Sequence, residues 1–136
     1  MRIAYVSVSD DLGGSEIALV EMIAAMRRLR PDWPLSAVLP GRGPLLERLS
    51  AAGASCHVVP LPDPLARAGE SAVADSGRPA RWAAFGLSLL RVGAVVPAYE
   101  RRLRQEIERI SPGIIHTNGF KAHVIVARSV KRVPLV

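Results

Sequence analysis

Two short polar segments carry the residues that could bind or transform a ligand. The first lies between an apolar, β-prone run and a helical repeat, so it falls where a strand gives way to a helix. A helix N-terminus offers unpaired N–H groups and a positive dipole end to an anion, and glycine lets a ligand approach the backbone closely. We therefore predict a binding loop here, although adjacent glycines also suit a simple tight turn. Its residues are Gly13, Gly14, Ser15 and Glu16.

The second segment follows a later strand and also precedes a helix. It brings an imidazole, an amide and an ammonium group together, and such groups can hydrogen-bond a polyol and neutralise a phosphate. The residues that we assign to the site are His116, Asn118, Gly119 and Lys121, with His116 as the candidate catalytic residue. In the alternative interpretation, Asn118 only caps the helix and His116 packs beneath it.

Several other chemistries do not fit the sequence. The glycines do not form the G-x-G-x-x-G pattern of dinucleotide-binding proteins, which disfavours an NAD-dependent dehydrogenase. Asp10 and Asp11 suggest the metal site of a receiver domain, but the third strand ends at Val59 with no acid after it. No nucleophile elbow, P-loop or spaced Cys/His set is present. We predict neither a metal nor a cofactor.

The remaining histidines are expected to be structural or exposed, and the single cysteine is expected to be structural. His57 falls on a strand and His123 inside a helix, while Cys56 has no second thiol with which to form an internal disulfide. The apolar run from Ile3 to Val8 is too short for the apolar region of a signal peptide, so we do not expect it to be one. The longest apolar stretch is interrupted by Arg91 and is shorter than the roughly 20 residues of a membrane span. We expect a cytoplasmic protein.

The first 60 residues predict a β-α-β-α-β order, which implies an α/β fold with a parallel sheet and helices on both of its faces. Ser15 is the expected N-cap of the first helix, and Gly53 is expected to stop the second. Because the carboxyl ends of parallel strands share one edge, the two polar segments should meet there. The expected strands are Ile3–Val8, Leu35–Leu39, Ser55–Val59 and Ile114–His116.

The second half is less regular. Residues 60–79 are rich in proline and glycine and predict a flexible loop. A long helix over 80–110, kinked near Pro97, a helix over 119–131 and a fifth strand from Val133 to Val136 should follow. A central strand is a poor place for a chain to end, so we expect residues 1–136 to be one domain truncated in its last strand.

The net charge of +6, from 18 basic and 12 acidic residues, suggests a basic face for phosphate or anionic lipid. Aromatic residues make up only 4%, which argues against nucleic acid. The helical region 78–109 is apolar at first and then rich in arginine, so it could lie on an anionic membrane surface. The alternative is a core helix followed by a solvated face.

The chain resembles the N-terminal domain of glycosyltransferase family 4. The resemblance rests on the run from Arg2 before the Gly13–Glu16 loop, and on the stretch 111–122, Ser-Pro-Gly-Ile-Ile-His-Thr-Asn-Gly-Phe-Lys-Ala. Gly113 departs from the family, which often has an acid there. The resemblance implies a Rossmann-like half of the two-domain GT-B fold, with the glycine loop near the donor phosphates.

The resemblance also implies a reaction, namely retaining transfer of a hexosyl group from a nucleotide sugar to a glycan or lipid-linked acceptor. The donor-binding C-terminal domain, with its paired glutamates, would belong to the same polypeptide, and this part alone would be inactive. The residues themselves leave two alternatives open. One is a non-catalytic sugar-phosphate-binding module, and the other is half of a different nucleotide-sugar enzyme.

Overall fold

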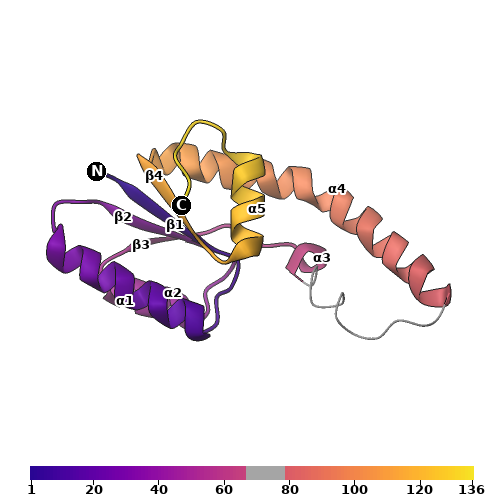
Figure 1. Cartoon of the computed structure of the whole chain (residues 1–136), viewed down its shortest axis with the longest axis horizontal. Helices are drawn as coiled ribbons and strands as arrows, with labels where there is room; N and C mark the ends of the chain where they lie inside the picture. The colour runs from indigo at the N-terminus through magenta and orange to yellow at the C-terminus, as the bar shows by residue number, and fades with distance from the viewer. Residues whose placement is uncertain (67–78) are drawn as a thin grey trace.

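The computed structural model describes residues 1–66 and 79–136, and side chains of the long helix that begins at Pro79 are described from Val95 onward. Four parallel strands form one sheet in the order β3-β2-β1-β4 (Figure 1). All four predicted strands are present; β2 has the predicted bounds, and the other three differ by one or two residues at their carboxyl ends. Their bounds are β1 (Ile3–Ser7), β2 (Leu35–Leu39), β3 (Ser55–Val58) and β4 (Ile114–Asn118).

The sheet is covered by helices on both faces, as predicted. On one face lie α1 (Gly14–Leu29) and α2 (Pro44–Ala51), and on the other lie α4 (Pro79–Ile110) and α5 (Phe120–Ser129) (Figure 1). Neighbouring residues of β1 enter different cores. Tyr5 packs in the cluster under α1 and α2, whereas Val6 packs in the cluster under α4 and α5. This two-sided burial explains why β1 is apolar from Ile3 to Val6.

The N-caps of α1 and α5 differ both from the predicted Ser15 cap and from the alternative interpretation of Asn118 as a cap. Helix α1 begins at Gly14, so Gly13 and not Ser15 is the N-cap, and no side chain caps the helix. The Ser15 hydroxyl instead donates to the neighbouring Glu16 carboxylate at 2.9 Å. Helix α5 has Gly119 as its N-cap, again without a side-chain cap. The interpretation of Asn118 as a helix cap is therefore wrong, which leaves its amide available for another contact.

The predicted loop over 60–79 contains a helix in the described part of that range. Asp63–Ala66 form a short helix, α3, because Leu65 is buried in the core beneath α4 and α5. Residues 67–78 lie outside the described part of the chain, and α4 begins at Pro79. Pro97 lies inside α4, and the expected kink stays a prediction.

The predicted fifth strand is reduced to one parallel bridge between Ile115 and Leu135. Hydrogen bonds of 2.8–2.9 Å still hold residues 134–136 beside β4. The segment thus occupies the fifth position of the sheet. Within the described ranges, none of the helices is long and apolar enough to pass through a bilayer.

Candidate functional site

The two predicted binding segments lie side by side at the carboxyl edge of the sheet. β1 and β4 are direct neighbours, and Ser7 pairs with Asn118 at the end of the shared ladder. The loop after β1 leads into α1 on one face, and the loop after β4 leads into α5 on the other. Gly14 and Asn118 therefore share one edge, as the sequence predicted.

Glu16 joins the two segments. Glu16 is 9% exposed, and its Oε1 accepts hydrogen bonds from Nδ2 of Asn118 at 3.0 Å and from Oγ of Ser15 at 2.9 Å. The contact with Asn118 spans 102 positions of sequence. Hydrogen bonds to an ionised group are stronger than neutral ones, so Glu16 is well suited to hold the two loops at a constant separation.

The adjacent glycines have different surroundings. A Cβ on Gly13 would come within 2.7 Å of Oε2 of Glu16, whereas a Cβ on Gly14 would meet nothing within 4 Å. Gly13 thus gives room to the carboxylate. Gly14 is exposed at the first position of α1, where its backbone is open to a ligand.

His116 lies two residues below the edge, inside β4. The prediction that this strand ends at His116 is wrong, because Thr117 and Asn118 continue the ladder with Val6 and Ser7. The imidazole lies beside Tyr5, with ring centroids 5.6 Å apart and planes tilted by 54°. Burial lowers the pKa of His116 below its ordinary value of 6.5, which favours a neutral ring that can both donate and accept a hydrogen bond.

The ammonium of Lys121 is directed toward α3. Its Nζ donates to the carbonyl oxygen of Ala66 at 2.7 Å and lies 3.5 Å from that of Leu65. A cation suits the carbonyl end of a helix. Gly119 has a φ of 93°, a left-handed conformation that favours glycine, so its role in the backbone turn is clear. Ligand contacts by Gly119 and Lys121 stay predictions.

A third loop also reaches this edge, and sequence reasoning treated it only as a turn. The Asp10 carbonyl oxygen accepts a hydrogen bond from the N–H of Leu45 at 3.0 Å. A Cβ on Gly41 or Gly43 would collide with Asp10. The sequence signal that could have identified this loop was the pair of glycines between β2 and α2, because β2 is a neighbour of β1 in the sheet.

Over the described ranges, no three acidic, cysteine or histidine residues form a possible metal site.

The other two histidines make contacts away from this edge or at its exposed rim. Nδ1 of His57 lies 2.8 Å from Glu106 and links β3 to α4. Nδ1 of His123 lies 3.0 Å from the Thr117 hydroxyl. Cys56 is a free, half-buried thiol.

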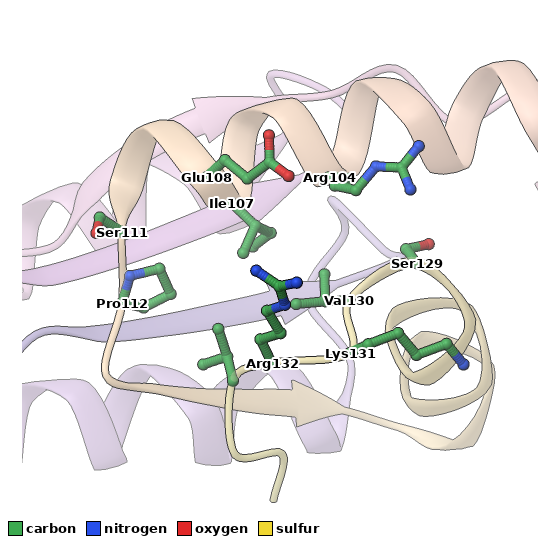
Figure 2. A pocket seen from close by; sticks show the side chains of 10 residues that line it. Arg104, Ile107, Glu108, Ser111, Pro112, Ser129, Val130, Lys131 and Arg132 are labelled. Atoms are coloured by element: carbon green, nitrogen blue, oxygen red, sulfur yellow. The ribbon is translucent and has the colours of Figure 1, made fainter.

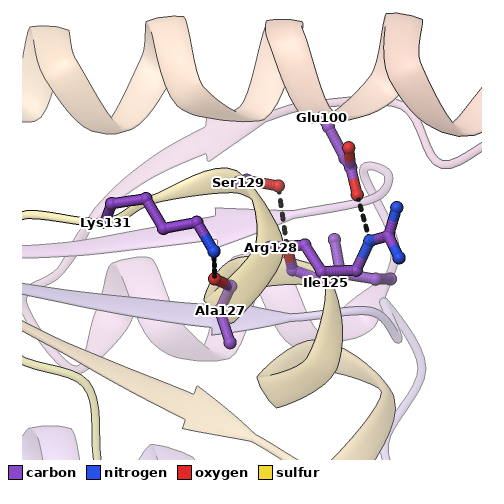
Figure 3. A network of polar contacts seen from close by, with 6 residues as sticks. All are labelled: Glu100, Ile125, Ala127, Arg128, Ser129 and Lys131. Carbon is purple, nitrogen blue, oxygen red and sulfur yellow. Dashed lines mark hydrogen bonds and ion pairs between the residues drawn. The ribbon is translucent and has the colours of Figure 1, made fainter.

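A cavity of about 450 Å³ lies at the opposite, amino edge of the sheet, where α4 and α5 end. Arg104, Lys131 and Arg132 line it over an apolar floor (Figure 2). Around the end of α5, the Lys131 ammonium bonds the Ala127 carbonyl at 3.1 Å, and the Ser129 hydroxyl bonds another helical carbonyl (Figure 3). The Lys131 and Ser129 contacts are accounted for by the end of α5. Because helix C-termini repel anions, the cavity is not our candidate site.

Comparison with known proteins gives a fold but no family. No family model and no curated protein matches the sequence. The structure of Anabaena HepE in complex with UDP aligns with 99% of this chain at a TM-score of 0.60 and 18% identity. The same protein with UDP and glucose aligns equally well. MurG of Acinetobacter baumannii aligns with 98% at a TM-score of 0.58 and 8% identity.

The fold is Rossmann-like. It matches one part of two proteins of the GT-B architecture. At these identities the likeness establishes the fold alone. The chain spans 28% of the HepE chain and 33% of the MurG chain, so any activity of the whole protein is a proposal.

Proposed function

We propose that this chain is the acceptor-side domain of a retaining glycosyltransferase. The enzyme would transfer a sugar from a nucleotide-sugar donor to a glycan or lipid-linked acceptor. The observation that carries the proposal is the hydrogen bond between Asn118 and Glu16, which joins two loops at the carboxyl edge beside the open backbone of Gly14. Ligands of open α/β sheets bind at this edge.

Each part of the site has a role in this proposal. The N-terminus of α1, with Gly13 and Gly14, would lie near the donor diphosphate, because its free N–H groups and dipole stabilise negative charge on the leaving phosphate. His116 and Asn118 would contact hydroxyls of the sugar or acceptor. The structures of HepE with UDP and with glucose support this ligand class.

The proposal also assigns a second, donor-binding domain to the same polypeptide. Catalysis would need both domains, with the reacting groups in the cleft between them, so residues 1–136 alone would be inactive. No resident metal or cofactor is assigned, since the nucleotide sugar is itself a substrate. We place the enzyme in the cytoplasm, with a peripheral contact to the inner membrane face as part of the proposal.

The test uses the complete reading frame that contains this chain. The purified protein is incubated with a panel of nucleotide sugars and with glycan and lipid-linked acceptors, and the anomeric configuration of the product is read by NMR. We expect transfer with retention. Gly14→Val, which fills the open space at the start of α1, should reduce binding of the donor. Binding of sugar phosphates without any transfer would contradict the proposal and favour the non-catalytic module.

A further inference from the structure

Glu16 lies where it controls which atom of Asn118 faces a ligand. We infer that Glu16 fixes the Asn118 carboxamide with Nδ2 toward the protein and Oδ1 toward the cleft, so that Asn118 recognises a hydroxyl group and not a phosphate. This inference rests on the proposed function, which it deepens by assigning one ligand chemistry to each loop.

The first step concerns hydrogen-bond polarity. An ionised carboxylate only accepts hydrogen bonds, while a carboxamide has donors on nitrogen and an acceptor on oxygen. Oδ1 facing Glu16 would place two acceptors in contact. Nδ2 must therefore face Glu16, as the 3.0 Å contact has it.

The second step concerns how firmly this orientation is held. Glu16 is 9% exposed, so little water competes for its oxygens. Ser15 donates to the same oxygen as Asn118, and Oε2 lies close to Gly13. The backbone of Asn118 is itself held by its pairing with Ser7 at the end of the β1–β4 ladder. A rotation of the carboxamide would break the bond to Glu16 and gain no replacement from these neighbours.

The third step concerns the ligand. Asn118 is half-buried at the carboxyl edge, and every buried side-chain polar atom in the described part of the chain has a hydrogen-bond partner. Its Oδ1 has no partner among the side-chain bonds of the described residues, so it is accessible at the edge. An exposed oxygen acceptor beside a carboxylate attracts an O–H donor and repels phosphate oxygens. The phosphates would then lie at the N-terminus of α1, and a sugar or acceptor hydroxyl would lie at Asn118.

The test exchanges the two polar groups at constant net charge. Asn118→Asp alone sets two carboxylates face to face, which is unfavourable. Adding Glu16→Gln supplies an amide donor to the new carboxylate and restores the link with its polarity reversed. The second oxygen of the aspartate still accepts a hydrogen bond from a ligand, but the side chain of residue 118 no longer has any N–H to donate.

The four proteins of this cycle are compared in the complete reading frame by thermal melting and by steady-state kinetics. We expect Asn118→Asp to lower Tm by about 4 °C or more and kcat/KM for the acceptor at least tenfold. The double variant should recover Tm, and its kcat/KM should return to within about threefold of wild type. Glu16→Gln alone should lower kcat/KM less than Asn118→Asp, since a glutamine can still accept from Asn118.

Two results of this cycle would overturn the inference. If the double variant melts no higher than Asn118→Asp, the two side chains are not coupled as described. If it regains Tm but keeps the kinetic defect, Asn118 acts on the ligand through its N–H. Failure of the proposed function is distinguishable, because it would appear as a wild-type protein without sugar transfer. The orientation is then read from the side-chain N–H signals of Asn118, which should shift upfield in Glu16→Ala; unchanged signals would overturn it.

Discussion

Gly13 lies directly against the carboxylate of Glu16, so that a Cβ on residue 13 would come within 2.7 Å of Oε2. The backbone of Gly13 is extended, with a φ of −104°, so its conformation does not require glycine. An added Cβ would instead meet the end of the Glu16 side chain, which would have to move. The same carboxylate holds Asn118 across the sheet edge, and the space at Gly13 therefore supports the contact between the two loops.

The two glycines should respond differently to alanine. Gly13→Ala must displace Glu16 and weaken its bond to Asn118, which we expect to cost about 1 kcal/mol of unfolding free energy. Gly14→Ala is the matched control, because its Cβ meets nothing and alanine favours a helix. Its stability should be equal to or above that of wild type. The unfolding free energies of both variants are measured by urea unfolding. Equal losses of unfolding free energy would show that the contact between residue 13 and Glu16 does not cause the destabilisation.

The role of His116 can be separated from its packing. His116→Phe keeps a ring beside Tyr5 but removes both hydrogen-bonding nitrogens. We expect its Tm to stay near that of wild type, while kcat/KM for sugar transfer falls roughly 10- to 100-fold, which corresponds to about 1–3 kcal/mol for a lost hydrogen bond. His116→Ala should lose activity and some stability. Full activity in a stable His116→Phe protein would make the histidine a packing residue only.

His116 should also make stability depend on pH. Burial lowers its pKa in the folded state below 6.5, so the unfolded chain binds more protons in the window just below that value. The stability that the neutral ring contributes is present above pH 6.5 and is lost as the pH falls through the folded-state pKa. Unfolding free energies of wild type and His116→Phe are compared between pH 7.5 and 5. The difference between them should change across the window, whereas parallel curves would contradict the prediction.

The ammonium of Lys121 should matter for stability. Lys121→Met leaves the partly buried carbonyl of Ala66 without its donor, and we expect a loss of about 1 kcal/mol. Lys131→Met is the control, because that ammonium also bonds a helical carbonyl but is exposed, and its loss should be close to zero. Donor KM is measured in parallel. A large rise in KM with unchanged stability would instead favour the phosphate contact predicted from the sequence.

Membrane contact is tested by liposome flotation of the complete protein. If the region 78–109 lies on an anionic bilayer, the protein should float with anionic vesicles at low salt and be released as salt screens the arginines. Neutral vesicles are the control. Equal behaviour with both vesicle types would leave this region as a core helix with a solvated face.

Local sequence signals were enough to predict the strands, the helices on both faces of the sheet and the shared edge of the two polar segments. These features depend on apolar periodicity and on glycine and proline stops, which act within a few residues. Gly53 illustrates this. Its φ of 95° is a left-handed conformation that favours glycine, and α2 ends just before it, as predicted. The prediction of the α1 cap failed because one side chain had two possible hydrogen-bond partners close by in the sequence. The Ser15 hydroxyl bonds Glu16 and does not cap α1.

The partners of the site residues were decided only by the tertiary structure. The strand order β3-β2-β1-β4 brings Asn118 beside Glu16, directs Lys121 to the end of α3 and sets Asp10 against the glycines after β2. Such contacts join residues far apart in the chain. Their formation depends on which strands are neighbours, on the register between them and on the buried space left at the edge, and no local preference encodes these three quantities.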